Sequence, residues 1–256
     1  MIFTRIIYSA ILIGIVAGAL LSVLQLVSLN PIIIAAEVYE SGPENNPEHS
    51  SELDSELSHN NADGHHDDSH AADEFERSSY SFLANILVST GFTAVLLALM
   101  VQFRIADGAR ISWAQGCLWG LAGFVAIFLA PALGLPPEIP GAEAAALPNR
   151  QLWWIFTVVS VAIGLCILAF ALNKLKFTGL LFLAMPYLVG APHNDGPAFT
   201  HADSEVVAAL EKLHEQFIIA SAGTSLVFWL LLGLACSYVF NRWFKSLSID
   251  GNYVDA

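Results

Sequence analysis

Apolar residues in this chain are gathered into long blocks separated by short polar segments. The blocks cover residues 6–28, 82–103, 111–133, 152–172, 177–191 and 217–240. A bilayer core of about 30 Å needs roughly 20 apolar residues in a helix, and five of these blocks reach that length. The block 177–191 has only 15 residues, and Pro186 interrupts its helical hydrogen bonding. The pattern predicts an all-α, polytopic membrane helix bundle with five to six transmembrane helices.

Composition supports this fold class, because 55% of the residues are hydrophobic and only 13% are charged. A soluble domain carries nearly twice that share of charge. The apolar length of the first block exceeds that of a cleaved signal peptide, so we expect an uncleaved anchor. We divide the chain into a first transmembrane helix (1–36), an extracytoplasmic loop (37–79), a helix bundle (80–246) and a cytoplasmic tail (247–256).

The basic residues predict the orientation, because short cytoplasmic loops retain lysine and arginine. With the N-terminus inside and six crossings, seven basic residues fall on the cytoplasmic side and three outside. The inner set is Arg5, Arg104, Arg110, Lys174, Lys176, Arg242 and Lys245; the outer set is Arg77, Arg150 and Lys212. We therefore expect a multi-pass protein of a bacterial inner membrane with both termini in the cytoplasm.

Acidic residues and histidines lie mostly on the side opposite the basic residues. Under this topology 20 of the 23 acidic residues and all eight histidines lie outside. The loop 37–79 alone carries 13 carboxylates against Arg77, a formal charge of −12. This segment has too few apolar residues to offset the loss of chain entropy on folding. We therefore expect it to be largely disordered until a ligand binds.

The centre of that loop is a candidate metal-binding strip. Its proposed ligands are His65, His66, Asp67, Asp68 and His70. Imidazole suits Zn, Co, Ni and Cu, and carboxylates add charge neutralisation. The alternative is a solvated acidic linker in which histidine is ordinary polar filler. A loop at −12 would in either case concentrate divalent cations within about a Debye length, roughly 8 Å at physiological salt.

The last external loop repeats this chemistry at lower density. It holds His193 with Asp195 and His201 with Asp203, followed by His214 in a helical pattern. Glu211, His214 and Glu215 have the i, i+3, i+4 spacing that places side chains on one helix face. A solvated amphipathic face is an equally good interpretation of that spacing. Glu37, just beyond the first block, is the candidate carboxylate at the mouth of a pathway.

The membrane blocks contain no ionised residue at mid-depth, so no charged relay is predicted there. The polar candidates for a pathway are Gln25, Asn85, Gln102, Gln115, Thr157 and Thr224, which could equally form hydrogen bonds between helices. The three cysteines, Cys117, Cys166 and Cys236, are either buried apolar residues or a soft-metal exit site. No C-x-x-C spacing and no phosphate-binding loop is present, and we expect neither an enzyme nor a prosthetic group.

Several motifs together resemble the CbtA family of predicted cobalt transporter subunits. They are LQ (24–25) with Pro31, AEVYE (36–40), LAPALGLPPEIPG (129–141), RQLWW (150–154), MPYLVGAP (185–192), and FW (228–229) with LLG (231–233). The resemblance implies cobalt uptake for cobalamin synthesis together with a small single-span partner, CbtB, that carries its own histidines. Members usually have about five spans, and Tyr187 stands where relatives are expected to carry histidine.

We therefore expect a membrane subunit of a cobalt or other divalent-metal uptake system. Its cargo would be Co²⁺, with Ni²⁺ or Zn²⁺ as alternatives, and its partners would be membrane lipid, a CbtB-type subunit and a further copy of the chain, but no nucleic acid. The competing hypothesis is a membrane metal sensor or assembly scaffold that does not transport.

Overall fold

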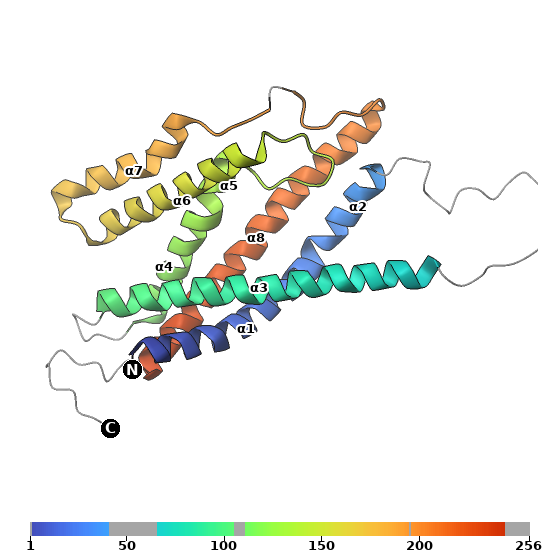
Figure 1. Ribbon diagram of the computed structural model, residues 1–256. Coiled ribbons are helices and arrows are strands. Elements are labelled where there is room, and N and C mark those ends of the chain that lie inside the picture. Colours follow the sequence, from blue (N-terminus) through green and yellow to red (C-terminus); the bar gives the residue numbers. More distant parts are fainter. Residues whose placement is uncertain (1, 41–65, 105–110, 195, 244–256) are drawn as a thin grey trace, which may run out of the picture.

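The computed structural model describes residues 2–40, 66–104, 111–194 and 196–243, and all regular structure within these ranges is helical (Figure 1). The helices, in chain order, are α1 (Ile2–Ser28), α2 (Asn30–Glu40), α3 (His66–Arg104), α4 (Trp113–Phe124), the π-helix η2 (Val125–Leu129), α5 (Ala130–Gly134), α6 (Leu147–Phe170), the short 3₁₀ helix η3 (Asn173–Leu175), α7 (Lys176–Val189) and α8 (Ser204–Trp243). The predicted all-α fold is confirmed.

Five helical stretches are long and apolar enough to cross a membrane. They are Phe3–Ser28, Ser78–Gln102, Trp113–Gly134, Leu147–Phe170 and Ser204–Trp243. The sixth apolar block forms α7, whose 14 residues span only about 21 Å at 1.5 Å per residue. Pro186 lies inside α7, and Gly190 ends it with a φ of 85°. The helix runs antiparallel to α6 and so returns the chain towards the end at which α6 began (Figure 1).

Glycines set the closest helix contacts. A Cβ atom on Gly14 or Gly18 of α1 would lie 2.5 Å from the Cα of Thr90 or Ile86 on α3. On the other side of the bundle, a Cβ on Gly233 of α8 would lie 2.3 Å from the carbonyl oxygen of Gly116 on α4. Small residues let helix backbones approach closely in a membrane, where van der Waals packing drives association. Gly14 and Gly18 in the first block, and Gly116 and Gly120 in the third, have the four-residue spacing of small residues that is typical of such contacts, and they serve as packing surfaces.

The third span changes partner along its length. Its first part, α4, packs on α8, while Ala126 of η2 and Ala130 of α5 pack against Val161 of α6. The α6–α7 hairpin is itself closed by Gly164 and Gly179, which face one another. The wide turn of η2 separates the two packing surfaces of this span.

The two ends of the chain's described part meet at one end of the bundle. The Arg5 guanidinium donates to the carbonyl oxygen of Trp243 over 3.1 Å, and Asn241 exchanges two hydrogen bonds with the backbone of Ile111. The start of α1, the start of α4 and the end of α8 are thus held together. We call this the basic end, because Arg5, Arg242, Lys174 and Lys176 lie here or in the turn between α6 and α7.

Two segments differ from the sequence expectation. The first span bends at Leu29, and the chain continues as α2, with Pro31 in its first turn, where a missing N–H is tolerated. Helix α3 begins at His66, so the backbone of 66–79 is helical where a disordered loop was expected. Alanine, glutamate and arginine in 71–77 have high helix propensity, and a helix already nucleated in the membrane extends at low cost. Residues 41–65 of the predicted loop lie outside the described residues.

Candidate metal-entry site

The end of the bundle opposite the basic end is built from four segments. They are α2, the loop 135–146, the loop 190–203 and the first turns of α8 (204–217). A small apolar cluster joins them, because Ala36, Ile139, Phe199 and Leu210 are all buried against one another. Helix α8 has 40 residues, about 60 Å, which is twice the thickness of a bilayer core, so its first turns project beyond the apolar part.

Carboxylates dominate this end, which we call the acidic end. Among the described side chains its acids are Glu37, Glu138, Glu143, Asp203, Glu205, Glu211 and Glu215, and its bases are Arg150 and Lys212. No carboxylate among the described residues lies at the basic end. The uneven charge distribution predicted for the two faces therefore has a physical counterpart in the two ends of the bundle.

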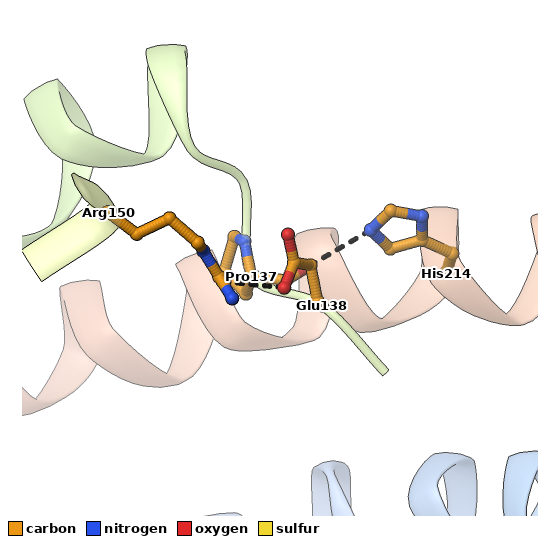
Figure 2. Close-up of polar contacts among 4 residues, drawn as sticks. All are labelled: Pro137, Glu138, Arg150 and His214. Carbon is orange, nitrogen blue, oxygen red and sulfur yellow. Dashed lines mark hydrogen bonds and ion pairs between the residues drawn. The ribbon is translucent and has the colours of Figure 1, made fainter. Parts of the chain in front are cut away.

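The loop 135–146 is fixed from two helices (Figure 2). His214 on α8 donates its Nε2 hydrogen to the carbonyl oxygen of Pro137 over 3.0 Å, and its ring meets Phe199 edge-on at 5.8 Å. Arg150 on α6 forms an ion pair with Glu138, the next residue of the same loop. Because the two contacts approach neighbouring residues from different helices, they fix both the position and the orientation of this loop.

Glu143 connects the two loops of the acidic end. Its carboxylate accepts hydrogen bonds from Thr200 Oγ1 at 2.7 Å and Asn194 Nδ2 at 3.1 Å, and its backbone N–H donates to the carbonyl of Ala198 at 2.8 Å. The three contacts hold the loop 190–203 over the loop 135–146. Glu143 is exposed, so its carboxylate also faces solvent.

The predicted ligands of the last loop make local contacts in this structure. Asp203 accepts from the N–H of Glu205, as an N-cap residue does at the start of α8, and His201 Nδ1 accepts from the N–H of Asp203. His193 Nδ1 bonds the carbonyl oxygen of Ala191 at 2.8 Å. One ring nitrogen of each histidine is thus engaged with backbone. In His193 the other nitrogen, Nε2, keeps its lone pair and can bind a metal. In His201 the accepted hydrogen bond leaves the proton on Nε2, so this ring must release Asp203 before it can bind a metal.

The described residues contain no group of three or more His, Cys, Asp or Glu side chains able to hold a metal ion. His65 and Asp195 lie outside the described residues, and for His66, Asp67, Asp68 and His70 only the helical backbone of α3 is described. Glu37 is half-buried on α2, next to the buried Ala36. The structure therefore brings Glu37 and His214 to one end of the bundle without assembling a coordination sphere from its described side chains.

Four of the six polar candidates within the membrane blocks, Gln25, Asn85, Gln115 and Thr157, form hydrogen bonds with other protein groups. Asn85 Nδ2 donates to Gln25 Oε1 at 2.6 Å and to Ser22 Oγ at 3.0 Å, which joins α3 to α1. Thr157 donates to the carbonyl of Trp153 within α6, and Gln115 completes the capping box at the start of α4. For these four residues the structure agrees with the alternative stated above, in which they form hydrogen bonds within or between helices.

The three cysteines do not converge. Cys236 is buried on α8, Cys117 is half-buried on α4, and Cys166 is exposed on α6. The soft-metal exit site considered from the sequence thus has no support among the described residues.

Three residues that shape the acidic end were not among the predicted site residues. Glu138 and Arg150 occur in the motifs noted above, but their pairing is invisible without the fold that brings α6 to the loop. Glu143 stands between two alanine-rich segments, and a lone acid in such a loop is a weak signal.

A sequence model of the family described as "Probable cobalt transporter subunit (CbtA)" matches residues 3–241 of this chain. The chain belongs to the CbtA family. The match covers nearly all of the five long helices and both loops of the acidic end, so this CbtA member is an integral membrane protein. No curated protein and no solved structure matches the chain.

Proposed function

We propose that this CbtA-family chain is the membrane-embedded subunit of a Co²⁺ uptake system whose acidic end receives the ion. The observation that carries the proposal is the separation of charge along the bundle: among the described residues, carboxylates and histidines lie at one end and basic residues without a neighbouring carboxylate lie at the other. A negative entry raises the local concentration of a divalent cation. The family description supplies cobalt as the cargo, with Ni²⁺ and Zn²⁺ as the competing ions.

In this proposal the strip formed by His65, His66, Asp67, Asp68 and His70 captures the ion. It then passes the ion to a mouth near Glu37, His193 and Asp195. His201, Asp203 and His214 contribute by holding the acidic end in shape, since each already bonds to backbone. His193 and His214 each keep the lone pair of one ring nitrogen for transient coordination. Selectivity would come from site geometry, because affinity among the divalent ions mostly follows the metal.

The basic end faces the cytoplasm in this proposal, in keeping with the retention of lysine and arginine on that side of a bacterial inner membrane. The contact between Arg5 and Trp243 is consistent with both termini on one side. A CbtB-type single-span subunit completes the system, and a second copy of this chain is a further candidate partner. No enzymatic step and no prosthetic group are invoked.

Removal of the capture strip tests the proposal. Deletion of residues 59–70, compared with replacement of His65, His66 and His70 by serine, would be assayed by accumulation of Co²⁺, Ni²⁺ and Zn²⁺ in cells with and without the partner subunit. A capture strip predicts that the half-saturating concentration rises about tenfold while the maximal rate is retained. Total loss of uptake would make the deleted segment part of the essential ion site and not merely a capture strip, and unchanged uptake would make the loop a solvated linker.

A sensor or scaffold role is the second candidate, and one observation favours it. The membrane-embedded polar side chains that could line a route, such as Asn85 and Gln25, are bonded to one another within one chain. A chain that binds metal but needs another subunit to move it would look the same. Purified protein in sealed vesicles separates the two roles: a transport subunit accumulates Co²⁺ when the partner is added, whereas a sensor binds Co²⁺ at the surface and never accumulates it.

A further inference from the structure

A groove of about 560 Å³ lies between the η2–α5 segment and α6, beside the fixed loop of the acidic end. Its inner part is apolar and is formed by Ile127 and Phe128 of η2 and by Ile155 of α6. Its outer part, nearer the start of α6, carries Arg150 and Trp154. The groove is therefore apolar in depth and polar at one end only.

Its position corresponds to the boundary between hydrocarbon and water. Arg150 lies in the first turn of α6, a helix of 24 residues that is long and apolar enough to span the bilayer. Tryptophan and arginine are the side chains that favour this boundary, because both have an apolar body and a polar tip. An occupant of the groove must match that order, with an apolar chain towards η2 and a polar group towards Arg150.

The charge at the polar end is paired. Arg150 and Glu138 place a guanidinium and a carboxylate side by side, and each side chain is about one quarter exposed, at 27% and 26%. The Nε–H of Arg150 is buried and has no hydrogen-bond partner among the described residues, so the guanidinium has spare donor capacity. A planar guanidinium binds phosphate well, whereas a carboxylate beside it attracts a protonated amine.

We propose that the groove binds one diacyl phospholipid with a phosphoethanolamine head group. One acyl chain lies along Ile127, Phe128 and Ile155, the phosphate meets Arg150, and the ammonium meets Glu138. A head group with phosphate but no amine would face Glu138 and the other carboxylates of the acidic end without compensation. Choline lacks the N–H donors that would satisfy the carboxylate. The inference is independent of which ion is transported.

The bound lipid would also stabilise the packing of the α6–α7 hairpin on the rest of the bundle. In the described part of the chain the hairpin packs mainly on η2 and α5, and Leu152, Ile155 and Val159, on the face of α6 that includes the groove wall, are exposed. A lipid held by head group and chain would bridge α6 to the η2–α5 segment across the groove. Ordinary boundary lipid, which exchanges rapidly, would give no such bridge.

Native mass spectrometry of the full-length protein from nanodiscs containing equal phosphatidylethanolamine and phosphatidylglycerol tests the proposal. The expected result is one retained lipid per chain, with phosphatidylethanolamine favoured at least fivefold. Ala132→Trp fills the groove and should abolish lipid retention. If this variant does not fold, Ile155→Trp, which fills the groove from the opposite wall, gives the same test. Leu188→Trp on α7 is the matched control, because Leu188 is 76% exposed and does not line the groove, and it should retain the lipid.

Arg150→Gln should reduce the preference for phosphatidylethanolamine to about twofold or less. Equal retention of the two lipids by the unmodified protein would overturn the proposal. So would retention that survives both groove-filling substitutions. Detection of a dimer without bound lipid, together with loss of that dimer in Ala132→Trp, would show that the groove is a subunit interface instead.

Discussion

His214 and Pro137 are joined by a hydrogen bond of 3.0 Å that ties a helix to a proline-rich loop 77 residues away in sequence. A proline carbonyl keeps its full acceptor capacity although the residue lacks an N–H donor. The His214 ring is half-buried and also contacts Phe199, which belongs to the second loop of the acidic end. One side chain thus holds both loops in place over α8.

His214→Phe tests this role. The substitution keeps an aromatic ring against Phe199 but removes the donor to Pro137, so we expect the free energy of unfolding to fall by about 1 kcal/mol. Thermal unfolding of the purified protein measures it. His214→Gln, which restores an N–H donor, should recover part of the loss. A fully stable His214→Phe variant with impaired Co²⁺ uptake would instead indicate that the ring binds metal.

The close contact of α4 with α8 gives a second prediction. Gly233→Ala would place a Cβ atom 2.3 Å from the Gly116 carbonyl oxygen, so the helices must separate. Overpacking of this kind costs about 1–3 kcal/mol. Gly223→Ala on the same helix is the control, because a Cβ there meets no atom within 4 Å. Equal melting temperatures for the two variants would contradict the packing shown between α4 and α8.

Asn85 separates a structural role from a pathway role. Asn85→Leu removes the hydrogen bonds to Ser22 and Gln25 while keeping a similar volume, and such bonds in membranes contribute about 0.6 kcal/mol on average. We expect a small loss of thermal stability and Co²⁺ uptake close to normal. Abolished uptake in a stably folded variant would place Asn85 on the ion's route.

External pH gives a fourth prediction. An imidazole must be neutral to bind a metal ion, and free histidine titrates near pH 6.5, so capture is complete well above that pH and weakens below it. Initial uptake at trace Co²⁺ should fall about tenfold between pH 7.5 and 5.5. The chain with His65, His66 and His70 replaced by serine should show a flatter profile. Uptake that stays level in the unmodified chain would argue against histidine capture.

Much of the bundle could be predicted from the sequence, because a membrane span is recognised from the length and apolar character of one continuous segment. Block lengths predicted six candidate spans, of which 177–191 is short, and the structure has five helices long and apolar enough to cross a membrane. Gly14, Gly18, Gly116 and Gly120 lie where helices approach most closely, in keeping with their four-residue spacing. The helical extension to His66 was missed, since a charged segment can be helical when a neighbouring span nucleates it. The pairing of Glu138 with Arg150 was also missed, because it depends on where α6 lies beside the loop.

The candidate site was less predictable for a similar reason. Residue type identified His201, Asp203 and His214 as potential ligands, but the same lone pairs and N–H groups serve backbone capping and loop anchoring equally well. Only the arrangement of neighbours separates these uses. The strip formed by His65, His66, Asp67, Asp68 and His70 remains a prediction, since its side chains lie outside those that the structure describes.

The wide turn η2 determines how the two halves of the third span are rotated relative to one another. An extra residue in a helix rotates everything after it by about 100° relative to what came before. Removal of one residue between Val125 and Leu129 would turn Ala130 and Pro131 away from α6 while leaving Gly116 and Gly120 against α8. A single-codon deletion would therefore uncouple the hairpin from the rest of the molecule, so the packing of both surfaces depends on the length of this segment.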